Sequence, residues 1–202
     1  KVRADTAQLC QHPFPGRDGR AARPVRRQQD ARGYADLMLI DPDGNLIYSV
    51  KKRDDFATNL ASGDGAASGL GRAYQAAAAM TEAGQVAFVD FSPYAAAAGA
   101  PESFVATPVF NNRDKLVGVL AAALSTASVD AIMAKSDGLG ETGESFFVGA
   151  DYLMRSDSRF SDTPDALITK FDNPVITTAL GGTAASGVSS DYREMNLILT
   201  AQ

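Results

Sequence analysis

Two segments of this sequence share one strand–turn–strand pattern, and this repeat limits the possible folds more than any other feature. The segments are residues 34–52 and 144–159, each with an apolar strand, an aspartate near the turn and a second strand that passes into serine and charge. In the first segment, DPDG places proline second and glycine last, which favours a tight turn and a β-hairpin. A repeat on this scale predicts two copies of one structural module.

The residues between the two hairpins predict the rest of the first module. A polar, glycine-rich insertion (51–71) precedes residues 72–80, which are rich in alanine and have high helix propensity. Three apolar stretches follow, joined by short turns: 85–91, 103–110 and 116–125. Short connections favour antiparallel pairing, so these residues predict one α+β unit with a five-stranded antiparallel sheet.

The second hairpin is followed by the same kinds of segment in smaller number. A polar insertion (160–172) leads to a short helix over 173–180, with Pro174 at its first position and glycines after its end. Two strands are expected over 186–192 and 195–200. We therefore expect a second module that is one strand shorter than the first.

The motif GLGETG, residues 138–143, matches the G-x-G-x-x-G pattern of dinucleotide-binding turns. Such a turn follows a strand and opens a helix, because the helix N-terminus holds the pyrophosphate. Here the order is reversed: residues 125–136 have the apolar spacing of a helix, and residues 145–149 have the pattern of a short strand. The motif therefore predicts a junction between the modules and no nucleotide site.

The charge distribution separates the first 32 residues from the rest. Residues 1–32 contain eight Lys or Arg and three Asp, whereas the whole chain has a net charge of −5. The remainder is therefore strongly acidic, which argues against a sequence-independent nucleic-acid binder. Because residues 1–32 are also rich in proline and have few apolar residues, we expect a helical or disordered N-terminal segment there.

The rarity of cysteine and histidine excludes several kinds of site. Cys10 and His12 are the only residues of their types, so the sequence predicts no disulfide framework, no cysteine zinc site and no Ser-His-Asp triad. Paired acids such as Asp54 and Asp55 occur without a nucleophile motif such as G-x-S-x-G. An enzyme stays an alternative class, but we predict no catalytic residue, metal or cofactor. The sequence has no run of about 20 apolar residues that could span a membrane.

Two such modules in tandem, with GLGETGE at their junction and LMRSDSR in the second hairpin, resemble the double Cache sensor domain, a PAS-like domain seen mainly in bacterial methyl-accepting chemotaxis proteins. This resemblance implies the extracytoplasmic (periplasmic) sensor domain of an inner-membrane receptor. It implies a small-molecule ligand in the membrane-distal module, a homodimer in the full receptor, and signalling through flanking membrane helices absent from this chain. The matching stretches cover most of the chain from residue 33 onward: 33–60, 88–94, 103–110, 116–121 and 137–159.

The resemblance also implies a fold class and boundaries. The fold class is α+β, with two tandem PAS-like Cache modules, each with an antiparallel sheet, behind an N-terminal helical segment. We expect the N-terminal segment at 1–32, the membrane-distal module at 33–125, a connecting helix and glycine turn at 126–140, and an incomplete membrane-proximal module at 141–202. Receptor histidine kinases and cyclases carry similar domains and stay alternatives, as does a module that docks a solute-binding protein.

The chain departs from the best-known amino-acid-binding subgroup of this family. That subgroup has an Arg-x-Trp pair, an aromatic-x-Asp pair after the third strand and an aspartate at the end of the fifth. This chain has no tryptophan; Tyr94 matches the aromatic, but Ala96 and Ala123 stand where the acids would be. A buried ligand ammonium needs a counter-charge, so the resemblance implies a ligand other than an α-amino acid.

A PAS-like pocket lies between the sheet and the helical insertion, and its polar groups come from both. Asp90 interrupts an apolar strand and either contacts the ligand or pairs with an arginine such as Arg72. Tyr94 follows Pro93 at a strand end and either contacts the ligand or packs with a satisfied hydroxyl. The predicted ligand-binding residues are Tyr48, Tyr74, Asp90, Ser92 and Tyr94.

Overall fold

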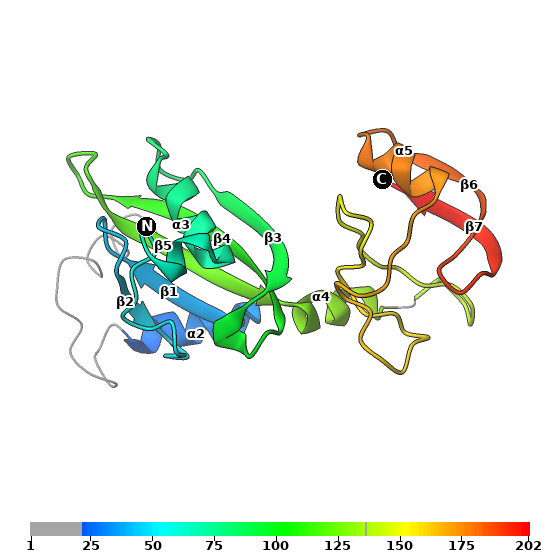
Figure 1. Ribbon diagram of the computed structural model, residues 1–202, viewed down its shortest axis with the longest axis horizontal. Helices are drawn as coiled ribbons and strands as arrows, with labels where there is room; N and C mark the ends of the chain where they lie inside the picture. The colour runs from blue at the N-terminus through cyan, green and yellow to red at the C-terminus, as the bar shows by residue number, and fades with distance from the viewer. Residues whose placement is uncertain (1–21, 136) are drawn as a thin grey trace. The chain divides into compact units, whose positions relative to one another are not determined.

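The computed structural model describes residues 22–135 and 137–202, which divide into two compact units. The first unit ends at Ser125 and the second begins at Thr126. The fold is α+β, with antiparallel sheets and a helix before the first strand (Figure 1). Of the predicted N-terminal segment, residues 1–21 lie outside the described residues. Over the described parts of the chain, no helix combines the length and apolar character needed to cross a bilayer.

The first unit is built on one five-stranded antiparallel sheet with the strand order β2-β1-β5-β4-β3. β5 is last in sequence but central in the sheet, where it pairs with both β1 and β4. It suits this place because it carries no charged side chain. The strands are β1 (Asp36–Ile40), β2 (Leu46–Ser49), β3 (Ala87–Pro93), β4 (Pro101–Phe110) and β5 (Leu116–Ser125), and two short 3-10 helices are η1 (Asp64–Ala67) and η2 (Ala95–Ala97).

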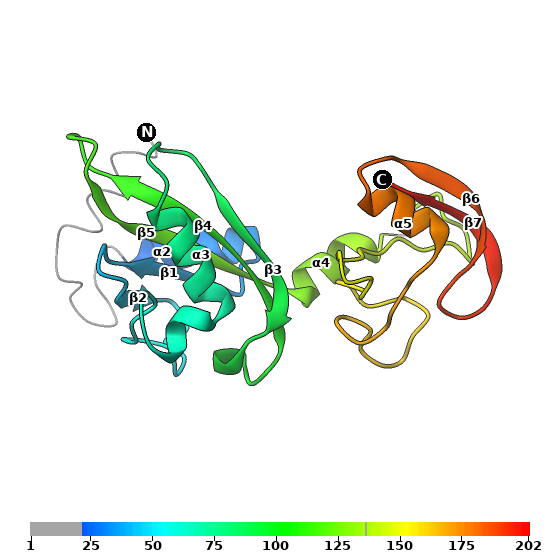
Figure 2. The ribbon, with the colours of Figure 1, turned by 45° about the horizontal axis from the view of Figure 1, so that its top comes forward.

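Two helices cover opposite faces of this sheet (Figure 2). α3 (Gly69–Ala78) packs on Met38 and Phe104 in the larger core. α2 (Ala22–Arg32) packs on Leu37 in a smaller core on the other face. Because successive strand residues point to opposite faces, β1, β2 and β5 contribute to both cores, whereas β3 and β4 contribute to the core under α3.

The helix α3 begins at Gly69, earlier than the sequence predicts from residue 72. Ser68 caps it, because its Oγ accepts a hydrogen bond from the Gly71 N–H at 2.9 Å. The preceding chain passes closely over this first turn, and a Cβ atom at Gly71 would lie 2.2 Å from the Gly65 carbonyl oxygen. Glycine permits this approach, whereas helix propensity alone places the start too late.

The second unit has fewer regular elements. β6 and β7 form a two-stranded antiparallel sheet, and α5 packs against both strands. Asn173 caps α5, because its Oδ1 accepts from the N–H groups of Val175 and Ile176 at 2.9 and 3.0 Å. The elements are α4 (Thr126–Met133), α5 (Pro174–Leu180), β6 (Ala185–Ser190) and β7 (Asn196–Ala201).

The predicted second hairpin forms with only a short ladder. One isolated bridge joins Val148 to Met154. The Phe147 carbonyl accepts from the Arg155 N–H at 2.8 Å, but the Phe147 N–H donates to Ser156 Oγ at 3.1 Å instead of to a carbonyl. A serine side chain thus takes the place of a ladder bond, which the apolar pattern of the segment does not indicate.

The glycine motif of residues 138–143 forms turns. Gly138 and Gly140 have φ values of 83° and 65°, where glycine is favoured. Within residues 137–173 the structure has no helix, and the next one is α5. A dinucleotide fingerprint needs a helix N-terminus directly after its glycines, and this segment does not supply one.

Candidate functional site

α3 covers one face of the main sheet with an apolar core. At one end of the sheet, the same face carries polar side chains. Side chains two residues apart on a strand share a face. Asp36 therefore joins the face of Met38, and Glu102 joins the face of Phe104, both of which belong to the core under α3. We call Ser49, Asp36, Glu102 and Ser92 the polar row; they lie on β2, β1, β4 and β3, and β5 passes between the first two and the last two.

Two β-bulges decide which side chains reach this row. A bulge inserts one extra residue and so reverses the face of the residues that follow it. The register of β2 shifts between Leu46 and Tyr48, which turns Tyr48 away from α3 and Ser49 toward it. The register of β3 shifts between Val89 and Ser92, which places Ser92 opposite Glu102.

Asp36 is buried and fully hydrogen-bonded, so it holds the chain that leaves β2. Its carboxylate accepts from Ser49 Oγ at 2.6 Å and from the N–H groups of Val50 and Lys51 at 3.0 and 3.1 Å. The side chain is 2% exposed. These bonds direct the loop after β2 across the end of the sheet, above the polar row.

Arg53, in that loop, forms an ion pair with Glu102. Its Nη1 donates to both Glu102 carboxylate oxygens, at 2.8 and 2.9 Å. Glu102 is only 3% exposed, and this burial raises the pKa of its carboxyl group, although the Arg53 guanidinium opposes the rise. The guanidinium is therefore committed to a carboxylate within the protein.

Tyr94 makes the second contact to a carboxylate at this end of the sheet. Its ring packs edge-on against Phe104, with 4.9 Å between centroids, and its hydroxyl donates to the Asp55 carboxylate. Burial, and then the bond to Asp55, raise the pKa of Tyr94 far above its usual range. The other Asp55 oxygen, Oδ1, is buried and has no hydrogen-bond partner. A buried acceptor of this kind is rare in proteins.

We define the acid–tyrosine cluster as Arg53, Asp55, Ser92, Tyr94 and Glu102. It combines two carboxylates with one guanidinium, so it favours a hydrogen-bond donor or a cation over an anion. α3 begins beside it, since a Cβ atom at Gly69 would lie 2.9 Å from the Phe104 ring and 3.4 Å from Ser92 Oγ. Among the described residues, no three acidic, histidine or cysteine side chains are grouped to hold a metal ion.

The structure brings two of the five predicted site residues, Ser92 and Tyr94, into this cluster. Tyr74 lies on α3 and donates to the Pro42 carbonyl oxygen at 3.0 Å, near the turn at the other end of β1. Tyr48 lies on the opposite face of the sheet, in the core under α2. Asp90 is exposed on β3, where its carboxylate accepts from the Phe91 N–H at 2.7 Å.

Sequence reasoning did not single out Arg53, Asp55 or Glu102 as ligand contacts. Glu102 carries a usable signal, because it is the only charged residue of the strand PESFVATPVF. An isolated acid in an apolar strand needs a partner. Arg53 and Asp55 lie in an aperiodic loop, and only the path of that loop places them at the cluster.

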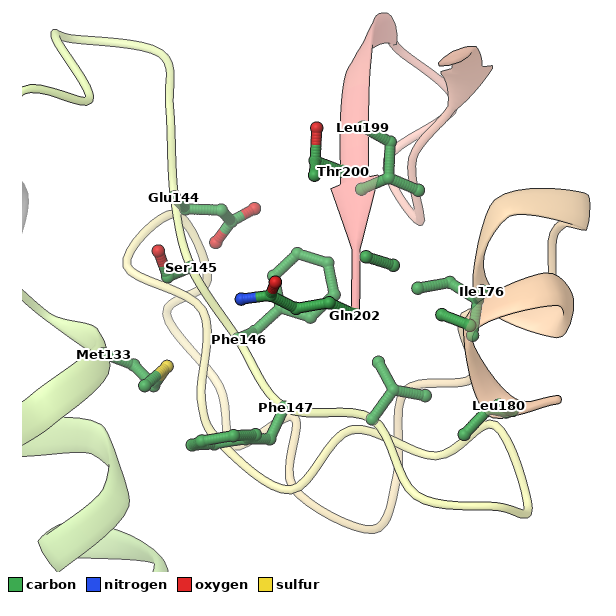
Figure 3. A pocket seen from close by; sticks show the side chains of 13 residues that line it. Met133, Glu144, Ser145, Phe146, Phe147, Ile176, Leu180, Leu199, Thr200 and Gln202 are labelled. Carbon is green, nitrogen blue, oxygen red and sulfur yellow. The ribbon is translucent and has the colours of Figure 1, made fainter. Parts of the chain in front are cut away.

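The second unit contains a pocket of about 370 Å³ (Figure 3). It lies between residues 144–148, β7 and α5, and we call it the β7 groove. Its walls are mainly apolar, with Phe146, Ile176 and Leu199 among them. The charged side chain in its wall is Glu144, whose carboxylate oxygens accept from the hydroxyls of Tyr192 at 2.7 Å and Ser158 at 2.6 Å. Glu144 is thus satisfied within the protein, unlike Asp55.

No protein-family model matches the sequence, and no curated protein matches it either. Solved structures do match. The extracellular domain of the putative histidine kinase rpHK1S-Z16 is 13% identical, with a TM-score of 0.66 over 98% of this chain and 78% of that one. The ligand-binding domain of the Pseudomonas aeruginosa PAO1 amino acid chemoreceptor PctC, in complex with GABA, is 16% identical, with a TM-score of 0.56 over 98% and 79%.

The V. cholerae histidine kinase DctB sensor domain is 16% identical, with a TM-score of 0.47, and this chain spans 57% of its length. Through the rpHK1S-Z16 and PctC matches, the chain is structurally similar to extracellular sensor and ligand-binding domains of histidine kinases and chemoreceptors. At these sequence identities the likeness shows a shared fold.

Proposed function

We propose that this chain is the extracytoplasmic ligand-binding sensor domain of a bacterial chemoreceptor, which reports a small molecule across the membrane. The likeness to PctC and to rpHK1S-Z16 supports the class of domain. A receptor histidine kinase is the alternative parent, since that class matches equally over 98% of the chain. In the full receptor the domain works as a homodimer at the periplasmic side of the inner membrane.

We propose further that the two compact units are tandem Cache modules. The five-stranded sheet with α3 forms a complete first module. The second unit repeats the order hairpin, helix, hairpin with α5, β6 and β7. In this proposal the ligand binds the first module, which holds the larger core and the acid–tyrosine cluster.

The observation that carries the proposed site is the buried Asp55 Oδ1 without a hydrogen-bond partner. Leaving a buried acceptor unpaired costs about 1–3 kcal/mol, and a ligand donor at this position would recover that cost. Tyr94 donates its hydroxyl to the other Asp55 oxygen, Glu102 provides a second carboxylate, and Ser92 lies opposite Glu102 on the neighbouring strand. In the proposed site these groups bind the polar end of the ligand.

The proposed ligand is an amine or a neutral hydrogen-bonding molecule rather than an α-amino acid. An α-carboxylate would need a cation, and Arg53 already neutralises Glu102. The alanines that replace the acids of the amino-acid-binding pattern offer no counter-charge, and Ala123 is 0% exposed. PctC was crystallised with GABA, in which an amine and a carboxylate are further apart than in an α-amino acid.

The test is a thermal-shift screen of the chain against amines, organic acids, nucleobases, sugars and amino acids. A ligand that binds only the folded chain stabilises it by about 2.7 kcal/mol at a hundred times its dissociation constant. Calorimetry then compares the wild type with Tyr94→Phe and Asp55→Asn. We expect each change to weaken binding about ten- to a hundredfold, because each removes one hydrogen bond at the cluster.

Tyr74→Phe is the matched control, since it removes the same hydroxyl from a tyrosine whose bond is to Pro42. Its affinity should equal that of the wild type. If Tyr74→Phe weakened binding and Tyr94→Phe did not, the site would be misplaced. Tight binding of an ordinary α-amino acid would contradict the proposed ligand class while leaving the sensor function in place.

A further inference from the structure

The polar groups of the acid–tyrosine cluster are covered in this structure. Glu102 is buried, Tyr94 is only 5% exposed, and Asp55 Oδ1, the acceptor without a hydrogen-bond partner, is itself buried. The loop after β2 covers them, since it reaches Glu102 through Arg53 and Tyr94 through Asp55. A small molecule can therefore bind these groups only after part of the chain has moved.

We define the strap as residues 52–57 of this loop. None of these residues belongs to either core of the unit, and none of their side chains is fully buried. Two polar contacts hold the strap to the sheet, the ion pair of Arg53 with Glu102 and the hydrogen bond from Tyr94 to Asp55, and we call them the two latches. A segment that buries so little apolar surface opens locally at a low cost in free energy.

The chain on either side of the strap is fixed in place. Before the strap, the Asp36 carboxylate holds the N–H of Lys51. After the strap, Asn59 Nδ2 donates to the Asp43 carbonyl oxygen at 3.0 Å, and Leu60 is buried in the core under α3. Movement of the strap is therefore confined to the residues between these two anchors.

The strap begins and ends at residues with an unusual backbone conformation. Lys52 and Ala57 have φ values of 50° and 67°, in the left-handed region that residues with a Cβ atom rarely occupy. Such a conformation costs free energy and persists only where the surrounding contacts hold it. Rotation of these two residues to an ordinary conformation would release this strain and swing residues 53–56.

We propose that the strap is a gate over the acid–tyrosine cluster, which turns at Lys52 and Ala57 and is held shut by the two latches. This inference rests on the proposed function, because the cluster is its ligand site. Asp55 belongs to the strap, whereas Glu102 belongs to the sheet. A ligand bonded to both carboxylates would hold the gate closed, so that ligand binding and closure are coupled.

N-acetylimidazole, which acetylates tyrosine hydroxyl groups, is a probe of gate opening, because the Tyr94 hydroxyl is bonded to Asp55 while the gate is closed. Arg53→Gln removes the ion-pair latch, so mass spectrometry should show about tenfold faster acetylation of Tyr94. Lys51→Gln is the matched control, because it removes the same charge from an exposed side chain next to the strap, and it should leave the rate unchanged. Acetylation of Tyr74, which is also buried, should keep its rate in both variants.

The second latch has a readout of its own. The Ala57 N–H donates to the Leu46 carbonyl oxygen at 3.2 Å, between the strap and β2, so its hydrogen exchange follows the opening of the gate. Tyr94→Phe removes the hydrogen-bond latch and should speed this exchange about fivefold, while the amides of β5 stay unchanged. This variant decides the matter if Arg53→Gln loosens the whole unit, which equally faster acetylation of Tyr74 would reveal.

Three results would overturn the gate. Acetylation of Tyr94 could stay at the wild-type rate in Arg53→Gln, or Lys51→Gln could speed it equally. Exchange at Ala57 in Tyr94→Phe could rise only together with exchange in β5, which would mean that the strap opens with the whole unit. None of these experiments adds a ligand from the screen, whereas failure of the proposed function would appear as a screen without a hit, so the two failures are distinguishable.

Discussion

Each unit of this protein packs a tyrosine hydroxyl against a carboxylate, but the two pairs differ in how fully the acid is hydrogen-bonded. In the first unit Tyr94 donates to Asp55, and its ring packs on Phe104. In the second unit Tyr192 donates to Glu144, and its ring lies 6.0 Å from that of Phe146. Both tyrosines are thus fixed by an aromatic neighbour and an acid.

The two acids differ in the number of their carboxylate oxygens that accept a hydrogen bond. Both oxygens of Glu144 have hydroxyl donors, and Arg193 Nη2 lies 3.6 Å from one of them. Asp55 has a donor on one oxygen only, and the other is buried without a partner. A satisfied network of this kind stabilises its unit, whereas an open acceptor lowers stability until something binds. The comparison gives the second pair a structural role and is consistent with the binding role proposed for the first.

The largest expected effect is a loss of stability in the first unit when the ring under Tyr94 is removed. It tests whether the apolar core holds the Tyr94–Asp55 pair in place. Phe104 is 0% exposed, and the Tyr94 ring packs edge-on against it. Phe104→Ala should therefore lower the free energy of unfolding of the first unit by about 4 kcal/mol. Hydrogen exchange of the slowest amides in β5 measures this. Phe88→Ala is the control, because Phe88 is 63% exposed on the neighbouring strand, and it should change the value by less than about 0.5 kcal/mol.

The second prediction compares the two acids directly. Glu144→Ala removes the acceptor of the Ser158 hydroxyl and leaves the Tyr192 hydroxyl only Ser158 Oγ, so it should destabilise the second unit by about 3 kcal/mol. Asp55→Ala removes one bond but also an unpaired buried oxygen, so it should cost the first unit about 1 kcal/mol or less. Unit-resolved hydrogen exchange measures both. Equal losses would remove the distinction between a structural and a binding acid.

The smallest expected effect is a pH dependence of the second unit. Burial, together with the Glu144 carboxylate, raises the pKa of Tyr192 to about 12 from its usual 10.0. The unfolded chain therefore loses this proton first, and stability should fall as pH rises from about 10 to about 12. The loss should be about 1 kcal/mol, because Tyr192 is partly exposed and screening weakens the shift. Urea unfolding of wild type and Tyr192→Phe measures it, and a slope that persists in the variant would assign the effect to another group.

Much of the fold follows from local sequence patterns. The apolar stretches of the first unit predict its strands, because a strand of a buried sheet must carry apolar side chains along most of its length. The cap at Asn173 and the proline after it predict α5 in the same way. The start of α3 and the short ladder at Val148 were not predictable, because they depend on a close backbone approach at Gly71 and on a hydrogen bond to Ser156.

The sequence by itself determined that the end of β3 is polar and aromatic, which pointed to Ser92 and Tyr94. Only the tertiary structure decided their companions. Arg53 and Asp55 reach the cluster because Asp36 directs the loop after β2 across the sheet, through bonds between residues up to 15 positions apart.

Tertiary structure also decided which face each predicted residue occupies. In an unbroken strand Tyr48 would share the face of Leu46 under α3, but the bulge between them turns it to the face of α2. The bulge in β3 likewise separates Asp90 from Ser92, which alternation alone would place together. A single extra residue reverses the side-chain alternation of a strand, and where it is inserted depends on pairing with the neighbouring strand rather than on the strand's own sequence.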